Sequence, residues 1–184
     1  MEKRELNSLD TEVLLRLLDY CKYLYEEEKE RTSRIEKKIN IFSLFLGGGV
    51  LVSLVLPLEK LQLLFNGNIL TQPLRLFGAV SYLVSLMVFL VSFLHIVSIY
   101  KVQKFETPTN PQTAVSKALQ IETLNDFISN VIADYSIAST RNHEINDTKA
   151  QYYSRALAFF VLGVLLSVVS ITVFNGLTFI NGGK

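Results

Sequence analysis

Three long stretches of this chain contain no Asp, Glu, Lys or Arg, whereas the segments around them are rich in charge. The uncharged stretches are residues 39–58, 76–100 and 156–183. Each reaches the about 20 mainly apolar residues that a helix needs to cross a bilayer. A soluble helix would instead repeat charged positions every turn on its hydrated face. The pattern therefore predicts an all-α membrane protein with three transmembrane helices.

The charged segments predict long helices that run directly into these spans. In residues 9–40, apolar positions recur at alternating steps of four and three, a spacing typical of a coiled-coil seam that Glu28 and Thr32 interrupt here. A second seam, in residues 113–155, leads into the third span. Its positions are Ile121, Leu124, Ile128, Val131, Tyr135, Asn142, Ile145 and Lys149. We expect the seams to form a long helical, coiled-coil-like cytoplasmic stalk, paired either as a hairpin within one chain or between subunits.

Positive charge sets the expected orientation. Fifteen of the eighteen lysines and arginines lie in residues 1–38 and 101–155, and three spans would put both segments on one side of the membrane. Because cytoplasmic loops carry the excess of basic residues, we expect a multi-pass membrane protein with a cytoplasmic N-terminus. The expected order is 1–38 cytoplasmic amphipathic helix, 39–58 first span, 59–75 external loop, 76–100 second span, 101–155 cytoplasmic linker and long helix, 156–180 third span and 181–184 external tail.

Small and polar residues form a stripe along the second span. Its members share one face of the expected helix, and they are Gly78, Ser81, Ser85, Ser92 and His95. Polar groups at membrane depth face either water or protein, so the stripe is interpreted as the lining of a pore or as a helix-packing face. A shorter stripe of Gly163, Ser167 and Ser170 in the third span allows the same two interpretations.

Composition and motifs add few chemical candidates. A net charge of +1 gives no basic excess for binding nucleic acid, so no such partner is expected. The single cysteine, Cys21, lies on the first seam without a nucleophile signature, and His143 has no second ligand at metal-binding spacing. The glycines at 47–49 lack the Lys-Ser/Thr of a phosphate loop. We expect no enzyme activity, no catalytic residues, no cofactor and no metal site.

Two junctions carry a resemblance. RTSRIEKKINIFSLFLGGG leads into the first span, and ADYSIASTRNHEINDTKAQYYSRALAFFVLG, with Asn142, Asn146 and Lys149, leads into the third. They resemble the SLATT and Pycsar transmembrane families, small bacterial effectors of nucleotide-signalled anti-phage defence, although three spans are expected here and two are usual there. The resemblance implies a homo-oligomer that disrupts or permeabilises the bacterial inner membrane.

The expected partners are the lipid bilayer, further copies of the chain, and a cytoplasmic sensor protein or a cyclic nucleotide signal. The alternative function is a non-conducting membrane scaffold whose helical stalk recruits a cytoplasmic partner.

Overall fold

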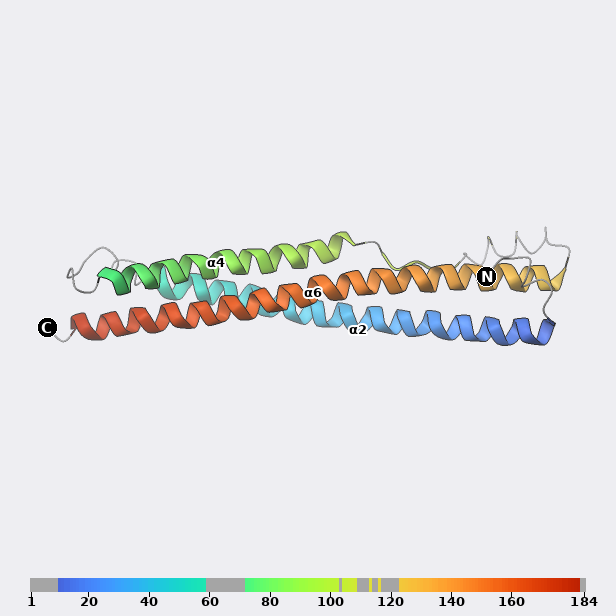
Figure 1. The fold of residues 1–184 in the computed structure, drawn as a ribbon, viewed down its shortest axis with the longest axis horizontal. Helices are drawn as coiled ribbons and strands as arrows, with labels where there is room; N and C mark the ends of the chain where they lie inside the picture. Colours follow the sequence, from blue (N-terminus) through green and yellow to red (C-terminus); the bar gives the residue numbers. More distant parts are fainter. Residues whose placement is uncertain are drawn as a thin grey trace. The chain divides into compact units, whose positions relative to one another are not determined.

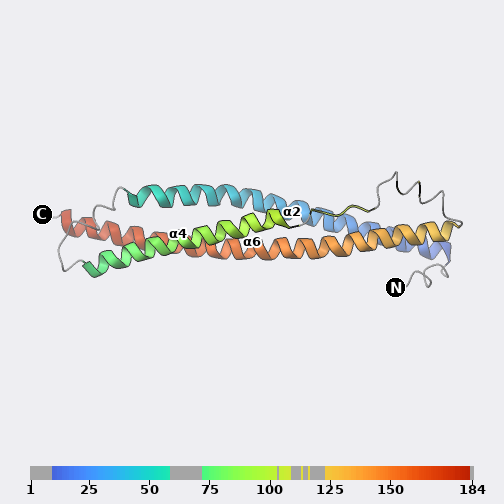
Figure 2. The ribbon, with the colours of Figure 1, turned by 90° about the horizontal axis from the view of Figure 1, so that it is seen from above.

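The computed structural model describes residues 10–58, 72–102, 104–108, 113, 116 and 123–182, with the side chains of 49–58 and 180–182 outside the description. The regular structure in this part of the chain is entirely α-helical (Figure 1). The helices are α2 (Thr11–Leu58), α4 (Gln72–Lys101) and α6 (Leu124–Gly182), each a continuous ribbon in Figure 2. The all-α class predicted from the sequence is confirmed for these residues.

Among the described residues, two helices are long and apolar enough to cross a membrane: α4, and α6 over Leu124–Phe179. Their most apolar windows have mean hydropathies of 2.3 and 2.7, yet only 33% and 17% of those windows are buried within the chain. The expected first span, residues 39–58, is helical within α2, and its side chains from Gly49 onward lie outside the described residues.

The ends of α4 and α6 differ from the prediction. Residues 59–71 lie outside the description, but Gln72–Arg75 of the expected external loop are the start of α4. Pro73, a residue type common in turns, fits the first turn of this helix because no intrahelical hydrogen bond is lost there. The long helix expected over 113–155 is not continuous, because α6 begins only at Leu124.

Thr123 caps the N-terminus of α6. The backbone N–H of Asp126 donates to Thr123 Oγ1 at 3.2 Å, and that hydroxyl donates to Asp126 Oδ2 at 2.6 Å. This reciprocal pair satisfies a backbone donor that the helix end would otherwise leave exposed. The acidic side chain also favours the positive end of the helix dipole.

The chain divides into two compact units, which are described separately. Unit 1 comprises the residues up to Glu36 together with Val102–Lys149, and unit 2 comprises Lys37–Lys101 together with Ala150–Lys184. The helices α2 and α6 each continue from one unit into the other, whereas α4 belongs to unit 2.

In unit 1, α2 and α6 run parallel. Their contacts advance together along both helices, from the hydrogen bond between Thr11 and Asn125 to the ion pair between Glu36 and Lys149. The apolar part of this contact contains the buried side chains of Leu14, Cys21, Ile128 and Ile132. A pairing within one chain is therefore present, and it is parallel rather than the antiparallel pairing of a hairpin.

In unit 2, α4 runs antiparallel to α6. Ser92 contacts Ala156, Ser85 contacts Gly163, and Gly78 contacts Ser170, so residue numbers fall along α4 as they rise along α6. Two glycines allow this close approach. A Cβ at Gly163 would lie 2.9–3.1 Å from ring carbons of Phe89, and one at Gly78 would lie 2.9 Å from a methyl of Val173.

Substituting Gly163 tests this packing. Gly163→Ala should lower the free energy of unfolding of the detergent-solubilised protein by about 1–3 kcal/mol, because the buried Phe89 ring must move. Gly176→Ala is the matched control, since its Cβ meets nothing within 4 Å and alanine is the better helix former. Thermal melts followed by circular dichroism measure both. Equal melting temperatures for the two variants would contradict the close α4–α6 contact.

Candidate functional site

A cluster of polar residues, of which Thr32, Asn146 and Lys149 are buried, lies where α2 and α6 of unit 1 face each other, close to the ends of their charged segments. We call this cluster the polar ladder. Its members form hydrogen bonds and ion pairs across the two helices, and they are Glu28, Arg31, Thr32 and Glu36 of α2 with His143, Asn146, Asp147 and Lys149 of α6.

Asn146 is the central member of the polar ladder. Its side chain has no exposed surface. The amide nitrogen donates to the backbone carbonyl of Glu28 at 3.1 Å and to Glu28 Oε2 at 2.8 Å, and the amide oxygen accepts from Thr32 Oγ1 at 3.0 Å. A buried carboxamide needs such partners, and a shift of either helix by one residue would remove them. The pair therefore fixes the register of α2 against α6, as a buried Asn does in coiled coils.

Glu28 also accepts from His143, whose Nδ1 lies 2.8 Å from Glu28 Oε1. Burial acts to raise the pKa of the Glu28 carboxyl, but hydrogen bonds from His143 and Asn146 and the charge of Arg31 hold it below its ordinary value. The hydrogen bond to Glu28, followed by the negative charge of Asp147, raises the pKa of His143 above its ordinary 6.5. The pair thus favours a carboxylate facing an imidazolium.

Arg31 and Lys149 complete the ion pairs of the polar ladder. Arg31 donates to Asp147 at 2.6 Å, and this hydrogen bond lowers the pKa of the Asp147 carboxyl. The Lys149 side chain is only 8% exposed, and its ammonium lies 3.3 Å from Glu36. Removing the exposed Glu36 carboxylate would leave the charge of the buried Lys149 without its ion-pair partner.

Asn142 holds a different segment, the stretch that follows α4. Its amide nitrogen donates to the Glu106 carbonyl at 2.8 Å, and its amide oxygen accepts from the Glu106 N–H at 2.7 Å. Arg141 contacts both carboxylate oxygens of Glu106 at 3.1 Å, and Phe105 packs on Tyr25 with ring centroids 5.4 Å apart. We call Glu106, Arg141 and Asn142 the Glu106 clamp.

The predicted seam residues are distributed as follows. Ile128, Asn142, Ile145 and Lys149 are buried, and Val131 and Tyr135 are partly buried. Leu124, the first residue of α6, is 64% exposed within the single chain, so its place in the seam stays a prediction. Ile121 lies outside the described residues.

The sequence pattern does not reveal Glu28, Thr32 and Asn146 as mutual partners. Glu28 and Thr32 interrupt the apolar seam of the first charged segment, and Asn146 is a polar residue near the seam of the second. A sequence signal for their contact would be that polar residues interrupt both seams at the same level along the paired helices.

The stripe of the second span lies against α6. Gly78, Ser81, Ser85 and Ser92 are all buried. Ser85 Oγ donates to the Gly163 carbonyl at 2.9 Å and lies 2.7 Å from Ser167 Oγ, while Ser92 Oγ donates to the Ala156 carbonyl at 2.7 Å. Ser170 Oγ donates to the Gly78 carbonyl at 3.0 Å. These hydroxyls therefore hold two helices together within the chain.

The remaining candidates are His95 and Cys21. His95 stacks on Phe159 with ring centroids 5.5 Å apart and an interplanar angle of 12°. Cys21 is buried, and burial raises the pKa of its thiol, which disfavours the reactive thiolate. In the described part of the chain, no group of three or more His, Cys, Asp or Glu side chains is placed to hold a metal ion.

No protein-family model, no curated protein and no solved structure matches this chain. Its function is therefore inferred from the polar ladder, the Glu106 clamp and the apolar helices themselves.

Replacing Asn146 tests the polar ladder. Asn146→Ala should destabilise unit 1 by about 1–3 kcal/mol, because the buried Glu28 carboxylate loses a donor and Thr32 loses an acceptor. Gln151→Ala removes an exposed carboxamide from the same helix and should change stability by less than about 0.5 kcal/mol. Urea titration of the detergent-solubilised protein compares them. A loss no greater for Asn146→Ala than for the control would sink this assignment.

The pH dependence of stability tests the pair between Glu28 and His143. A raised folded-state pKa means that His143 stabilises the fold below its ordinary pKa and that this stabilisation is lost as pH rises through the raised value. The lowered pKa values of Glu28 and Asp147 remove stability only at more acidic pH. Melting temperatures from about pH 5.5 to 8 should therefore fall more for the natural chain than for His143→Gln. Parallel curves for the two proteins would contradict the pair.

Proposed function

We propose that this chain is a three-span membrane effector whose cytoplasmic helical stalk receives a signal and whose spans then permeabilise the bacterial inner membrane in anti-phage defence. One observation carries the proposal: α2 and α6 pass without a break from the polar ladder into uncharged stretches. A change in the pairing of the stalk helices is thereby applied directly to two spans. The resemblance at both junctions adds the defence role.

The membrane setting is supported by exposed apolar side chains in unit 2. Large residues such as Leu44, Met87 and Phe179 are 79%, 65% and 87% exposed, alongside the low burial of the most apolar windows of α4 and α6. A water-soluble protein rarely exposes so much contiguous apolar surface. Lipid is the solvent that such a surface requires.

The directions of the helices support three spans with a cytoplasmic N-terminus. In unit 1, α2 and α6 are parallel, and in unit 2, α4 and α6 are antiparallel. In the proposed topology, the spans of α2 and α6 cross the membrane in the same direction and α4 returns. The basic residues at the ends of the uncharged stretches then lie on the same side of the membrane. These residues are Lys37, Lys38, Lys101 and Arg155.

The signal is best supplied by a sensor protein. A groove of about 320 Å³ in unit 1 lies beside the polar ladder, and its lining includes Glu27, Glu144 and the pair of Glu28 with His143. Because His143 and Arg31 compensate the charge of Glu28, the excess negative charge of the groove comes from Glu27 and Glu144. These two carboxylates disfavour the phosphate of a cyclic nucleotide and favour a basic protein segment. Within each copy, the hydroxyls of Ser85 and Ser92 donate to carbonyls of α6, so they are not free to line a pore in a single chain. We therefore expect permeation to need several copies of the chain.

The second candidate function is a non-conducting membrane scaffold. The observation that favours it is the same set of buried serines. In the described part of the chain, the hydrogen-bond partners of Ser85 and Ser92 are atoms of α6, so the second span offers no wet face there. In this case the polar ladder and the groove beside it would serve only to recruit a partner.

Inducible expression in bacteria, with membrane potential followed by a dye, tests the proposal. Induction together with phage infection should depolarise the cells within one infection cycle, whereas Asn142→Ala combined with Asn146→Ala should not, because the stalk no longer transmits its pairing. Gln151→Ala should behave as the natural chain. An intact potential under every condition would favour the scaffold.

Cysteine labelling in the same cells, in a Cys21→Ser background, checks the topology. Tyr20→Cys and Thr140→Cys should react only from the cytoplasm, and Asn66→Cys only from outside. Labelling of residues 20 and 66 from one side would remove the first span from the proposal.

A further inference from the structure

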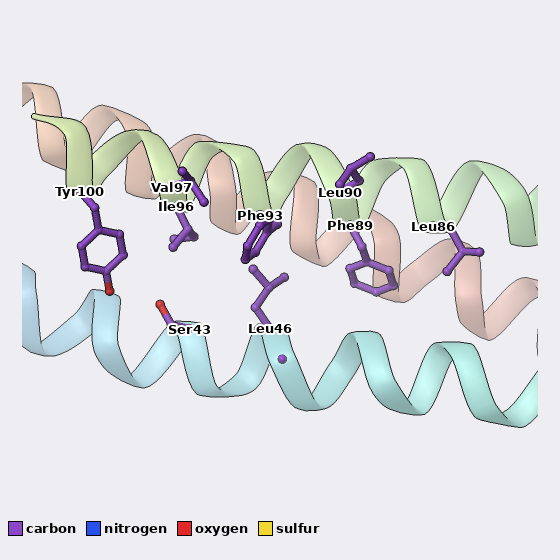
Figure 3. Close-up of a pocket in the computed structure, with 10 residues that line it drawn as sticks. Ser43, Leu46, Leu86, Phe89, Leu90, Phe93, Ile96, Val97 and Tyr100 are labelled. Atoms are coloured by element: carbon purple, nitrogen blue, oxygen red, sulfur yellow. The ribbon is translucent and has the colours of Figure 1, made fainter.

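Unit 2 contains an apolar groove between α2 and α4 (Figure 3). It has a volume of about 820 Å³, and its lining includes Ser43, Leu46 and Gly47 of α2 and Phe89, Phe93 and Tyr100 of α4. We call it the α2–α4 groove. Along α4 it extends from Leu86 to Tyr100, which is about 21 Å of helix.

The two ends of the α2–α4 groove differ in polarity. Figure 3 shows the hydroxyls of Ser43 and Tyr100 at one end, pointing into the space between the helices, whereas Leu86 and Phe89 at the other end carry only carbon. Gly47 adds width, because nothing lies within 4 Å of a Cβ built there. The groove is therefore polar at its Tyr100 end and apolar along the rest of its length.

Unpaired positive charge lies at the polar end. Lys101 directly follows Tyr100, and Lys37 and Lys38 precede Ser43 by one to two turns of α2. All three are exposed, and none forms an ion pair with a carboxylate in the described part of the chain. Residues 37–58, 72–101 and 150–182 contain no Asp or Glu at all. The polar end thus offers cations that the described residues of unit 2 do not neutralise.

We propose that the α2–α4 groove binds an anionic phospholipid, with an acyl chain against Leu46, Phe89 and Phe93 and the phosphate headgroup near Ser43, Tyr100 and the three lysines. This inference rests on the membrane setting of the proposed function. Length agrees with it, because half of a hydrocarbon core about 30 Å thick is about 15 Å, and the groove covers that distance and the headgroup level. Charge complementarity selects an anionic headgroup over a neutral one.

A helix of a second copy is the competing occupant. Such a helix would fill the apolar part of the groove, but as an apolar span it would leave the three lysines without anions. The lipid satisfies both the apolar wall and the charge with one molecule, and the observations therefore favour it.

Fluorescence quenching by brominated lipid tests the site, because the natural chain contains no Trp. A single Trp is placed in the groove as Phe93→Trp, and at the neighbouring depth outside the groove as Leu94→Trp, where the side chain is 54% exposed. The full chain is reconstituted in vesicles of phosphatidylcholine and phosphatidylglycerol, with bromine on the acyl chains of one lipid or the other at equal mole fraction.

Phe93→Trp should be quenched more by brominated phosphatidylglycerol than by brominated phosphatidylcholine, whereas Leu94→Trp should respond equally to both. Each of Lys37→Gln and Lys101→Gln, added to Phe93→Trp, should reduce this preference roughly fivefold at low salt, because each removes one near-surface cation.

Three results would overturn the proposal, and they differ from one another. Equal quenching by both lipids at both positions would mean that the groove selects no headgroup. Protection of the Phe93→Trp indole from both lipids, with Leu94→Trp still quenched, would mean that a second copy fills the groove. Absence of quenching at both positions would show that unit 2 is not in the bilayer, so that the proposed function fails together with the lipid site.

Discussion

The buried carboxamide of Asn146 is the constraint on which the architecture of unit 1 depends. It has no contact with water, so its donors and its acceptor must be satisfied by Glu28 and Thr32. Apolar seam residues tolerate sliding because one leucine packs much like another. A carboxamide with three defined partners does not, and it therefore selects one register for two helices that each continue into an uncharged stretch.

Buried polar groups also need hydrogen-bond partners in unit 2, where the surroundings are apolar, and this need explains how α4 and α6 pair there. A serine hydroxyl in a membrane helix must find an acceptor in protein, and Ser85, Ser92 and Ser170 each use a backbone carbonyl of the facing helix. Gly163 makes room for the Phe89 ring, which packs in turn on Phe160, and Phe160 on Phe42 of α2. Hydrogen bonds and aromatic packing thereby join three helices without relying on the hydrophobic effect.

The elements were more predictable from the sequence than their partners. Steps of three and four marked Ile128 and Ile145 as seam positions, and both side chains are buried, because helical periodicity depends only on spacing. The direction of the pairing, parallel within one chain, was not available from periodicity, since a seam looks the same from either end. The Glu106 clamp could not be predicted either. Asn142 bonds the backbone N–H and carbonyl of Glu106, and every residue except proline carries both groups, so the sequence does not identify the partner. The start of α6 was predictable in principle from the N-cap pattern of Thr123 and Asp126, but the apolar seam continues upstream of it.

Both the buried serines and the unpaired lysines bear on how such a chain would act on a membrane. Because the second span uses its hydroxyls within the chain, a conducting path formed by unchanged subunits would have to run between copies or along displaced lipid. The α2–α4 groove is lined by other residues of α4 than these serines, and in the proposed lipid site the nearby lysines would attract an anionic headgroup. A rearrangement of α2 that closed or widened this groove would change lipid packing without breaking a single hydrogen bond between α4 and α6.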